Sequence, residues 1–92
     1  MKKLSELMLE GYAMVPRQAK GVFCRGNPNR PRSVCALGAV CLAKHGNADA
    51  FDRRTNNDHA RFEMRVGITI TKLNDEGMSI PDIAGIAAAE GL

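Results

Sequence analysis

The sequence predicts a mainly all-α domain: a compact bundle of four to five short helices that spans residues 1–92 and surrounds a central helix near residues 33–46. Three observations lead to this fold class. The segment 33–46 is the most apolar in the chain, and its apolar side chains cover nearly the whole circumference of a helix. Aromatic residues make up only 4% and tryptophan is absent, so the core must consist of small aliphatic side chains, which suit close helix packing. A chain of 92 residues is long enough for one domain with a modest core.

The ends of the central helix carry recognisable capping residues. Ser33 stands where an N-cap is expected, because its hydroxyl can accept a hydrogen bond from a free amide of the first turn. Gly46 stands where a left-handed residue ends a helix, and Lys44 and His45 lie near the negative end of the helix dipole. Small residues within the segment allow neighbouring helices to approach closely: Ala36, Gly38, Ala39 and Ala43.

Residues 2–10 predict a first helix that Gly11 ends. Its apolar residues recur at helical spacing on one face: Leu4, Leu7 and Met8. The following residues have no clear period, and Pro16 breaks any helix there. One helix and an irregular stretch are therefore expected before residue 21.

Two short segments lead into the central helix. Residues 21–24 are apolar and few enough for a brief extended segment. Residues 25–32 are expected to form a loop, because one glycine, two asparagines and two prolines fall within eight positions. Beyond the central helix, residues 47–54 predict a helical turn or short helix with Asn47 or Asp49 as its cap.

Residues 55–74 allow two interpretations. Residues 55–58 have the form of a capping box, and apolar residues recur at helical spacing after it: Phe62, Val66, Ile70 and Leu73. Yet residues 61–71 also alternate between polar and apolar and are rich in β-branched side chains. Because a lone strand without a partner is unstable, we expect a helix to about Asn74. An α+β fold would follow if residues 61–71 formed a strand.

The last helix is expected to begin after a turn at residues 76–78. Ser79 is its predicted N-cap, Pro81 falls in the first turn, and Asp82 faces the positive end of the dipole. Its buried stripe is predicted to consist of Ile80, Ile83, Ile86 and Ala87. This opening resembles the first half of a helix-turn-helix unit, but the printed sequence shows no recognition helix after it, so we do not expect it to read a major groove.

The chain is positively charged in its first half. The net charge is +3, but residues 1–46 carry eight Lys and Arg against two acids, a local +6, whereas residues 47–92 carry five against eight, a local −3. Between Gly11 and Ala48 there is no acidic residue. A basic region of this kind attracts phosphate backbones, acidic protein surfaces or the acidic half of the same chain.

Cysteine usage and hydropathy bear on the compartment. Three cysteines without a signal peptide indicate thiols in a reducing cytosol, and we expect a cytoplasmic protein. Residues 1–10 are amphipathic and interrupted by Glu6 and Glu10, unlike a secretory signal. No segment approaches the roughly eighteen apolar residues that span a bilayer, so no membrane partner is expected.

Several short motifs together resemble a family of small bacterial and phage proteins. They are the pair Gly11-Tyr12, then Gln18, the run Cys-Ala-Leu-Gly-Ala at 35–39, and Leu-Asn-Asp at 73–75 ahead of a serine-capped final helix. Tyr12 replaces an expected tryptophan, and the arginine-rich segment 25–32 is peculiar to this chain. The resemblance implies a compact helical fold and brings no assigned activity.

The arginine-rich loop is the strongest candidate for a binding site. Arginine's planar guanidinium suits phosphate and carboxylate alike, and proline and asparagine around it limit the entropy lost on binding. The candidate partner-binding residues are Arg17, Lys20, Arg25, Arg30 and Arg32. Alternatively, these residues only solvate the loop or pair with Asp49, Asp52 and the acidic C-terminal half. No aromatic residue lies within the loop to stack on bases.

Chemical sites are weaker candidates. Cys35, expected in the first helical turn near arginines, could form a reactive thiolate, although a buried core role explains it as well. The residues that could hold a metal are Cys24, Cys35, Cys41 and His45, but they lack the Cys-x-x-Cys spacing of a zinc site. His59, Asp58 and Glu63 could act in acid–base catalysis, but a solvent-exposed helix face explains their spacing better. No cofactor is expected.

These observations favour a non-enzymatic interaction module of phage or accessory bacterial type. Its basic loop would bind an acidic protein or a nucleic-acid–protein assembly. Two alternatives remain open at this stage: a weak binder of phosphate backbones, and a thiol-dependent sensor or enzyme that uses Cys35.

Overall fold

The computed structural model describes residues 2–92, and within them the chain forms five helices and one two-stranded antiparallel sheet. The helices are α1 (Leu4–Met14), α2 (Ala36–His45), α3 (Arg53–Val66), α4 (Ile70–Asp75) and α5 (Ile80–Ala89), and the strands are β1 (Cys24–Asn27) and β2 (Arg30–Val34). The prediction of a mainly helical fold is confirmed, with the addition of a small sheet. Among the described residues, no helix is both long and apolar enough to cross a bilayer.

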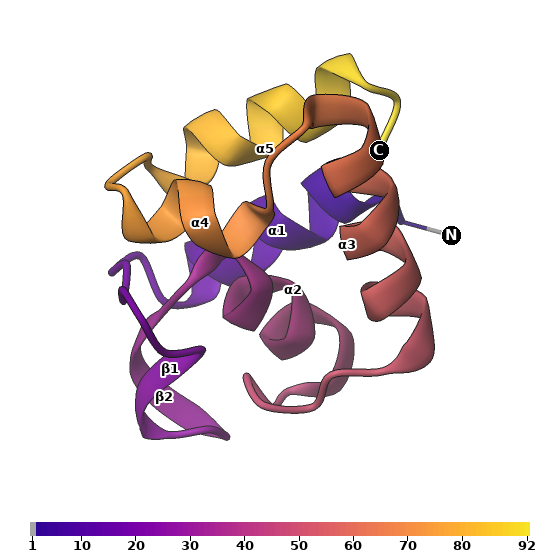
Figure 1. Cartoon of the computed structure of the whole chain (residues 1–92). Helices are drawn as coiled ribbons and strands as arrows, with labels where there is room; N and C mark the ends of the chain where they lie inside the picture. The colour runs from indigo at the N-terminus through magenta and orange to yellow at the C-terminus, as the bar shows by residue number, and fades with distance from the viewer. Residues whose placement is uncertain (1) are drawn as a thin grey trace.

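The core lies between α1, α2 and α5. Figure 1 shows α1 between α5 on one side and α2 on the other, with α3 along one end and the β1–β2 hairpin projecting at the other. Every residue from Ala36 to Leu42 is buried, which confirms the central position of α2. The backbone amide and hydroxyl of Ser5 donate to the carbonyl oxygen of Leu92, so the two ends of the described chain lie together.

The sequence predicted the C-terminal end of the central helix correctly but not its N-cap. Gly46 ends α2 in the left-handed conformation with φ 66°, as expected. The N-cap, however, is Cys35, whose Sγ accepts a hydrogen bond from the Gly38 amide, and the prediction of Ser33 was wrong. Ser33 instead pairs with Arg25 in the sheet, because β2 extends the chain as far as Val34.

The first helix does not end at Gly11, contrary to the prediction. It continues to Met14, and Gly11 is buried where α1 crosses α2. A β-carbon on Gly11 would overlap the carbonyl oxygen of Ala39, so the missing side chain lets the two helices come into backbone contact. Glycine at this position serves packing rather than helix termination.

The expected loop over residues 25–32 is in fact a β-hairpin. Its turn chemistry was read correctly, since Pro28 and Asn29 form the tip and the Oδ1 of Asn27 accepts a hydrogen bond from the Asn29 amide. The strands pair with each other, and the end of β2 is also bonded to the segment before the hairpin: Ala19 N–H donates to the Val34 carbonyl and Val34 N–H to that of Arg17. Of the extended segment predicted at 21–24, only the last residue belongs to a strand.

The third helix begins earlier and ends earlier than predicted. Residues 47–51 form turns rather than a helix, and the N-cap of α3 is Asp52, not a residue of the predicted capping box. Residues 61–66 are helical, so the strand interpretation of 61–71 is wrong. Gly67, with φ 88°, then ends α3, and Thr69 caps the separate helix α4.

The last helix agrees closely with its prediction. The Oγ of Ser79 accepts a hydrogen bond from the Asp82 amide, and Pro81 lies in the first turn. Its buried residues are Ile80, Ile83, Ala84 and Ala87, whereas Ile86 is only half-buried.

Candidate functional site

A pair of side-chain amides, the buried Asn74 and the half-buried Gln18, holds the base of the hairpin in place. The side-chain oxygen of Asn74, in α4, accepts hydrogen bonds from the Gln18 side chain at 2.8 Å and from the Ala36 amide at 3.0 Å. Its amide nitrogen donates to the Ala19 carbonyl at 2.7 Å. Asn74 is fully buried and its polar atoms are satisfied, so it ties α4 to the start of α2 and to the segment that precedes the hairpin.

Gln18 completes this connection on the other side. Its amide nitrogen also donates to the Met78 carbonyl at 2.7 Å, and its oxygen accepts from the Ile80 amide at 3.0 Å. The short motifs by which the sequence resembles the small bacterial and phage proteins therefore have structural positions. Gly11 and Gly38 lie at close backbone contacts, and Gln18 and Asn74 bond to each other. These positions build the scaffold rather than a reactive site.

The hairpin packs on this scaffold through close backbone contacts. A β-carbon on Gly38 would overlap the carbonyl oxygen of Phe23, so α2 and the residue before β1 touch directly. The Cys35 amide donates to that same carbonyl at 2.9 Å, and the Ala48 amide donates to the Pro28 carbonyl at the tip. Both ends of the hairpin are thus fixed to the helical body.

Three arginines lie on the surface of this hairpin. We call β1 and β2 with Arg25, Arg30 and Arg32 the basic hairpin, and all three side chains are exposed. The strand register is irregular at Arg25 and Gly26, where Gly26 has φ 89°. A β-carbon on Gly26 would lie 3.4 Å from Nε of Arg32, so the Arg32 side chain rests against the open backbone of β1.

The other two predicted binding residues lie on the neighbouring segment. The side chains of Arg17 and Lys20 are exposed; the Arg17 carbonyl accepts a hydrogen bond from the Val34 amide of β2, and Lys20 follows Ala19, whose amide donates to the Val34 carbonyl. The fold thus brings all five predicted basic residues onto adjacent segments of chain. Within residues 2–92, none of the five forms an ion pair.

Among the described residues, the acids expected to neutralise the hairpin form no ion pair with its arginines. Asp52 binds Lys44 and His45 instead, and Asp49 forms no ion pair in the described part of the chain. The structure therefore does not support the alternative in which the arginines pair with Asp49 and Asp52. Their guanidinium groups are left in solvent.

Sequence reasoning missed an aromatic pair beside the hairpin. The rings of Phe23 and Phe51 stack with their centroids 5.7 Å apart. Phe51 is 36% exposed, and the nearby residue Val22 is 45% exposed. No sequence pattern joins positions 23 and 51, because the turns after α2 bring them together.

Burial disfavours thiolate at each cysteine. Cys35 is 3% exposed, and burial raises its pKa despite the hydrogen bond that its sulfur accepts from the Gly38 amide. Burial raises the pKa of Cys41 to about 12, and that of the half-buried Cys24 is raised as well. The arrangement does not favour the reactive thiolate considered for Cys35.

The metal candidates are not gathered into one site. Cys41 is buried within α2 and Cys35 is buried at its N-cap, whereas His45 is exposed at the C-terminal end of α2. Cys24 is half-buried at the start of β1. Among residues 2–92, no group of three or more His, Cys, Asp or Glu side chains is placed to hold a metal ion.

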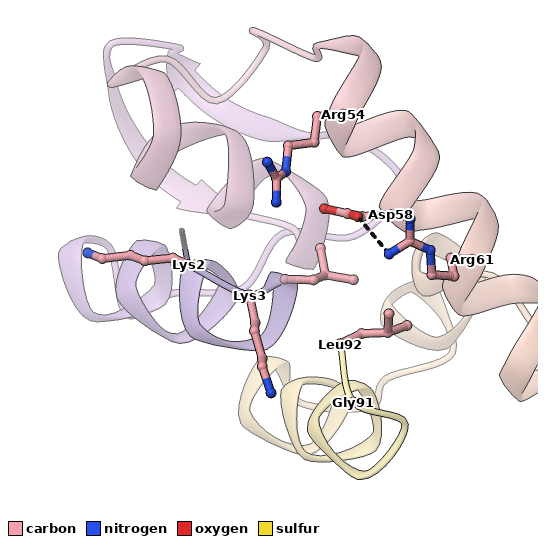
Figure 2. A pocket seen from close by; sticks show the side chains of 8 residues that line it. Lys2, Lys3, Arg54, Asp58, Arg61, Gly91 and Leu92 are labelled. Atoms are coloured by element: carbon pink, nitrogen blue, oxygen red, sulfur yellow. Dashed lines mark ion pairs between the residues drawn. The ribbon is translucent and has the colours of Figure 1, made fainter.

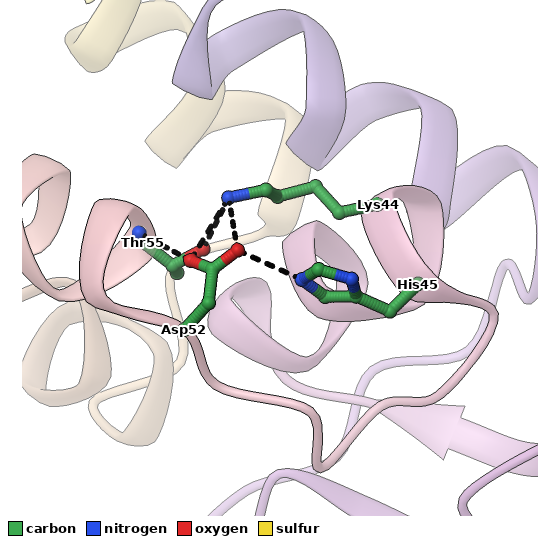
Figure 3. Close-up of polar contacts among 4 residues, drawn as sticks. All are labelled: Lys44, His45, Asp52 and Thr55. Atoms are coloured by element: carbon green, nitrogen blue, oxygen red, sulfur yellow. Dashed lines mark hydrogen bonds and ion pairs between the residues drawn. The ribbon is translucent and has the colours of Figure 1, made fainter.

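A polar cluster joins the end of α2 to the start of α3. In Figure 3, Lys44 and His45 point from α2 toward Asp52, which also accepts a hydrogen bond from the Thr55 amide at 2.7 Å. The Lys44 ammonium also donates to the Thr55 hydroxyl at 2.9 Å. The hydrogen bond from Lys44 has the largest effect on the pKa of Asp52, and that from the Thr55 amide the next largest. Together they hold this pKa well below its usual range. The cluster therefore has a structural role: Asp52 caps the start of α3 and ties it to the basic residues at the end of α2.

The possible acid–base trio does not form a connected site. His59 is half-buried, and burial lowers its pKa. Its Nε2 atom is buried without a hydrogen-bond partner among the described residues. Asp58 lies 3.9 Å from Arg61 rather than against the imidazole.

Comparison with family models, curated proteins and solved structures gave no significant match.

Proposed function

We propose that this chain is a non-enzymatic interaction module, of phage or accessory bacterial type, that binds an acidic surface of a partner protein or nucleic-acid–protein assembly. The observation that carries the proposal is the basic hairpin, whose three arginines are exposed and form no ion pair within residues 2–92. A guanidinium in solvent that has no partner in its own chain can form bidentate contacts with carboxylates without first breaking another ion pair.

The backbone of the hairpin adds a second means of contact. In the described chain, β1 pairs on one side with β2, and no other segment hydrogen-bonds to the backbone of residues 24–27. A strand edge of this kind accepts an extended segment of a partner through main-chain hydrogen bonds. An acidic extended segment would meet both the open edge and Arg25 on the same strand.

The fixed attachment of the hairpin supports the same function. Hydrogen bonds at Pro28 and Phe23 and the Gln18–Asn74 pair limit the movement of the strands. A surface that is already ordered loses less conformational entropy on binding.

The proposal is tested by affinity capture from the native cell with three forms of the protein. Arg25→Glu with Arg30→Glu reverses two hairpin charges and leaves Arg32, which contacts the β1 backbone, in place. Arg53→Glu with Lys72→Glu is the matched control, because both residues are exposed and unpaired in residues 2–92 and lie outside the hairpin. The proposal predicts a partner protein that the wild type and the control variant both capture and that is lost with the hairpin variant. Retention of that partner by the hairpin variant would contradict it.

A second candidate function is direct binding of a single-stranded nucleic acid. The exposed edge of the Phe23–Phe51 pair next to the basic hairpin supports it, since stacking on aromatic rings and cationic grooves together bind single strands. A fluorescence titration with an oligonucleotide decides between the two. Affinity that falls steeply with salt supports the nucleic acid, and no binding at low salt removes it.

A further inference from the structure

We propose that a second basic surface, separate from the basic hairpin, binds the phosphate group of a small phosphorylated molecule. A hollow of about 110 Å³ lies between the start of α1, the first half of α3 and the end of the chain after α5. Four cationic side chains line it: Lys2, Lys3, Arg54 and Arg61. Figure 2 shows the guanidinium of Arg54 extending from α3 into the space beside Asp58 and above the start of α1. We call this hollow the basic pocket.

The charges of the basic pocket are poorly neutralised. Among the described residues that line it, Asp58 is the only acid, and the nearest Arg61 nitrogen lies 3.9 Å from its carboxylate. Lys2 pairs with Glu10, whereas Lys3 and Arg54 form no ion pair in the described residues. With Lys2 paired to Glu10 and Arg61 to Asp58, the unpaired cations Lys3 and Arg54 leave an excess of positive charge at the hollow, which a dianion such as a phosphate monoester would relieve.

Two helix N-termini add to this potential. The helix α1 has eleven residues and begins at Leu4, which lines the pocket. The helix α3 has fourteen residues and begins at Arg53, so Arg54 lies in its first turn. The positive end of the α1 dipole therefore lies at the hollow and that of α3 lies near it. The amides of Lys3 and Ser5 donate to the Glu6 carboxylate and the Leu92 carbonyl, and Asp52 caps α3, so an anion would be held by side chains rather than by these amides.

A larger hollow beside the basic pocket gives room for the rest of the ligand. Its volume is about 330 Å³, and it shares Lys2 and Arg54 with the basic pocket. Leu7 supplies an apolar wall, and the Lys44–Asp52 ion pair forms the polar side. This volume is at the lower end of the roughly 300–1,000 Å³ usual for small-molecule sites. The pair of hollows therefore fits a phosphate attached to a hydroxylated ring, as in sugar phosphates and nucleoside monophosphates.

This inference does not depend on the proposed function of the hairpin. None of the residues that line either hollow belongs to β1, β2 or the segment from Arg17 to Lys20. The two surfaces can consequently be tested with separate variants of the same chain.

The test is a titration followed by amide chemical shifts in nuclear magnetic resonance spectra. Inorganic phosphate, ribose 5-phosphate, adenosine 5′-monophosphate and unphosphorylated ribose are the probes. The proposal predicts saturable shifts for residues 2–7 and 52–61 with at least one of the two phosphorylated compounds, at about tenfold or more higher affinity than inorganic phosphate, and none with ribose. The stronger of the two compounds then distinguishes a sugar phosphate from a nucleotide.

Two double variants complete the experiment. Lys3→Gln with Arg54→Gln removes two exposed, unpaired charges of the basic pocket and should weaken binding about tenfold or more, with shifts elsewhere unchanged as evidence of folding. Arg25→Gln with Arg30→Gln should leave the affinity unchanged. Absence of saturable binding, equal affinity for inorganic phosphate and both phosphorylated compounds, or equal affinity of the pocket variant would each overturn the proposal.

Discussion

The side chains of Gln18 and Asn74 meet in the interior, with 2.8 Å between Nε2 of Gln18 and Oδ1 of Asn74, although 56 positions separate them in the chain. The pair joins the segment before the hairpin to α4, and each amide bonds to backbone groups of two further segments. Because a buried polar group that loses its partner keeps its full desolvation cost, this pair is expected to be among the most sensitive positions of the chain.

Replacement of Asn74 by alanine should be strongly destabilising. It leaves the Ala36 amide, the Ala19 carbonyl and one Gln18 hydrogen without their partner, and the free energy of unfolding should fall by about 3 kcal/mol or more. Urea denaturation measures this loss. In a double-mutant cycle, Gln18→Ala with Asn74→Ala should cost less than the two single changes added together, because the variants share the lost contact. Strict additivity would show that the two amides are not coupled.

Two helical glycines should respond in opposite directions to alanine. At Gly11 the added carbon would overlap the Ala39 backbone, so Gly11→Ala should lower stability by about 1–3 kcal/mol or more as the helices separate. Gly85 in α5 has no atom within 4 Å of an added carbon, so Gly85→Ala should stabilise by about 0.5–1 kcal/mol. Denaturation midpoints measure both effects. Destabilisation of similar size at the two sites would contradict the close crossing of α1 and α2.

The carboxylate of Asp52 should make stability depend on pH below about pH 5. Its pKa is lowered in the folded state by hydrogen bonds from Lys44 and the Thr55 amide, so its stabilisation is full above the unfolded pKa of about 4 and is lost as pH falls toward the folded value. Asp52→Asn keeps a capping oxygen but removes the charge, at a cost of about 1 kcal/mol at pH 7, since this partly exposed pair is screened by solvent.

The measurement compares wild type and Asp52→Asn by denaturation at pH 7 and pH 3. The difference in free energy of unfolding should shrink at the lower pH. Asp82→Asn serves as the control, because Asp82 is exposed in the first turn of α5 and forms no ion pair in residues 2–92. A difference for Asp52→Asn that stays constant between the two pH values would refute the assignment.

The three thiols should react slowly in the folded protein. Burial raises the pKa of Cys35 and takes that of Cys41 to about 12, so at pH 7.5 both should be alkylated only as fast as the protein opens. Cys24 is half-buried and should react first, and Cys24→Ser should remove that phase. Rapid labelling of Cys35 in native protein would instead restore the thiol-dependent function as a candidate.

Local signals in the sequence were sufficient for much of the helical fold. The cap at Ser79 and the apolar stripe after it predicted α5 correctly, and Gly46 predicted the end of α2. The hairpin was missed because the glycine, asparagine and proline residues at 25–32 have the composition of a loop. The pairing of β1 with β2, and the bonds of Val34 to the segment before them, are contacts that composition does not record. The end at Gly11 was misread because a glycine in contact with another helix has the same sequence appearance as one that terminates a helix.

The candidate site divides in the same way. The arginines of the hairpin were found because unbalanced charge is visible in composition alone. The basic pocket was not found, because Lys3 and Arg54 come from helices that only the tertiary fold brings together. The Phe23–Phe51 pair and the Gln18–Asn74 pair escaped notice for the same reason.

The central claim is that the basic hairpin is the surface that recognises an acidic partner. Its most direct measurement is a titration of the labelled protein with a glutamate-rich peptide, followed by amide chemical shifts at low salt. The claim predicts saturable shifts confined to residues 17–34, which disappear in the Arg25→Glu, Arg30→Glu variant and persist in the Arg53→Glu, Lys72→Glu control. Shifts that lie elsewhere on the chain, or that survive reversal of the hairpin charges, would contradict it.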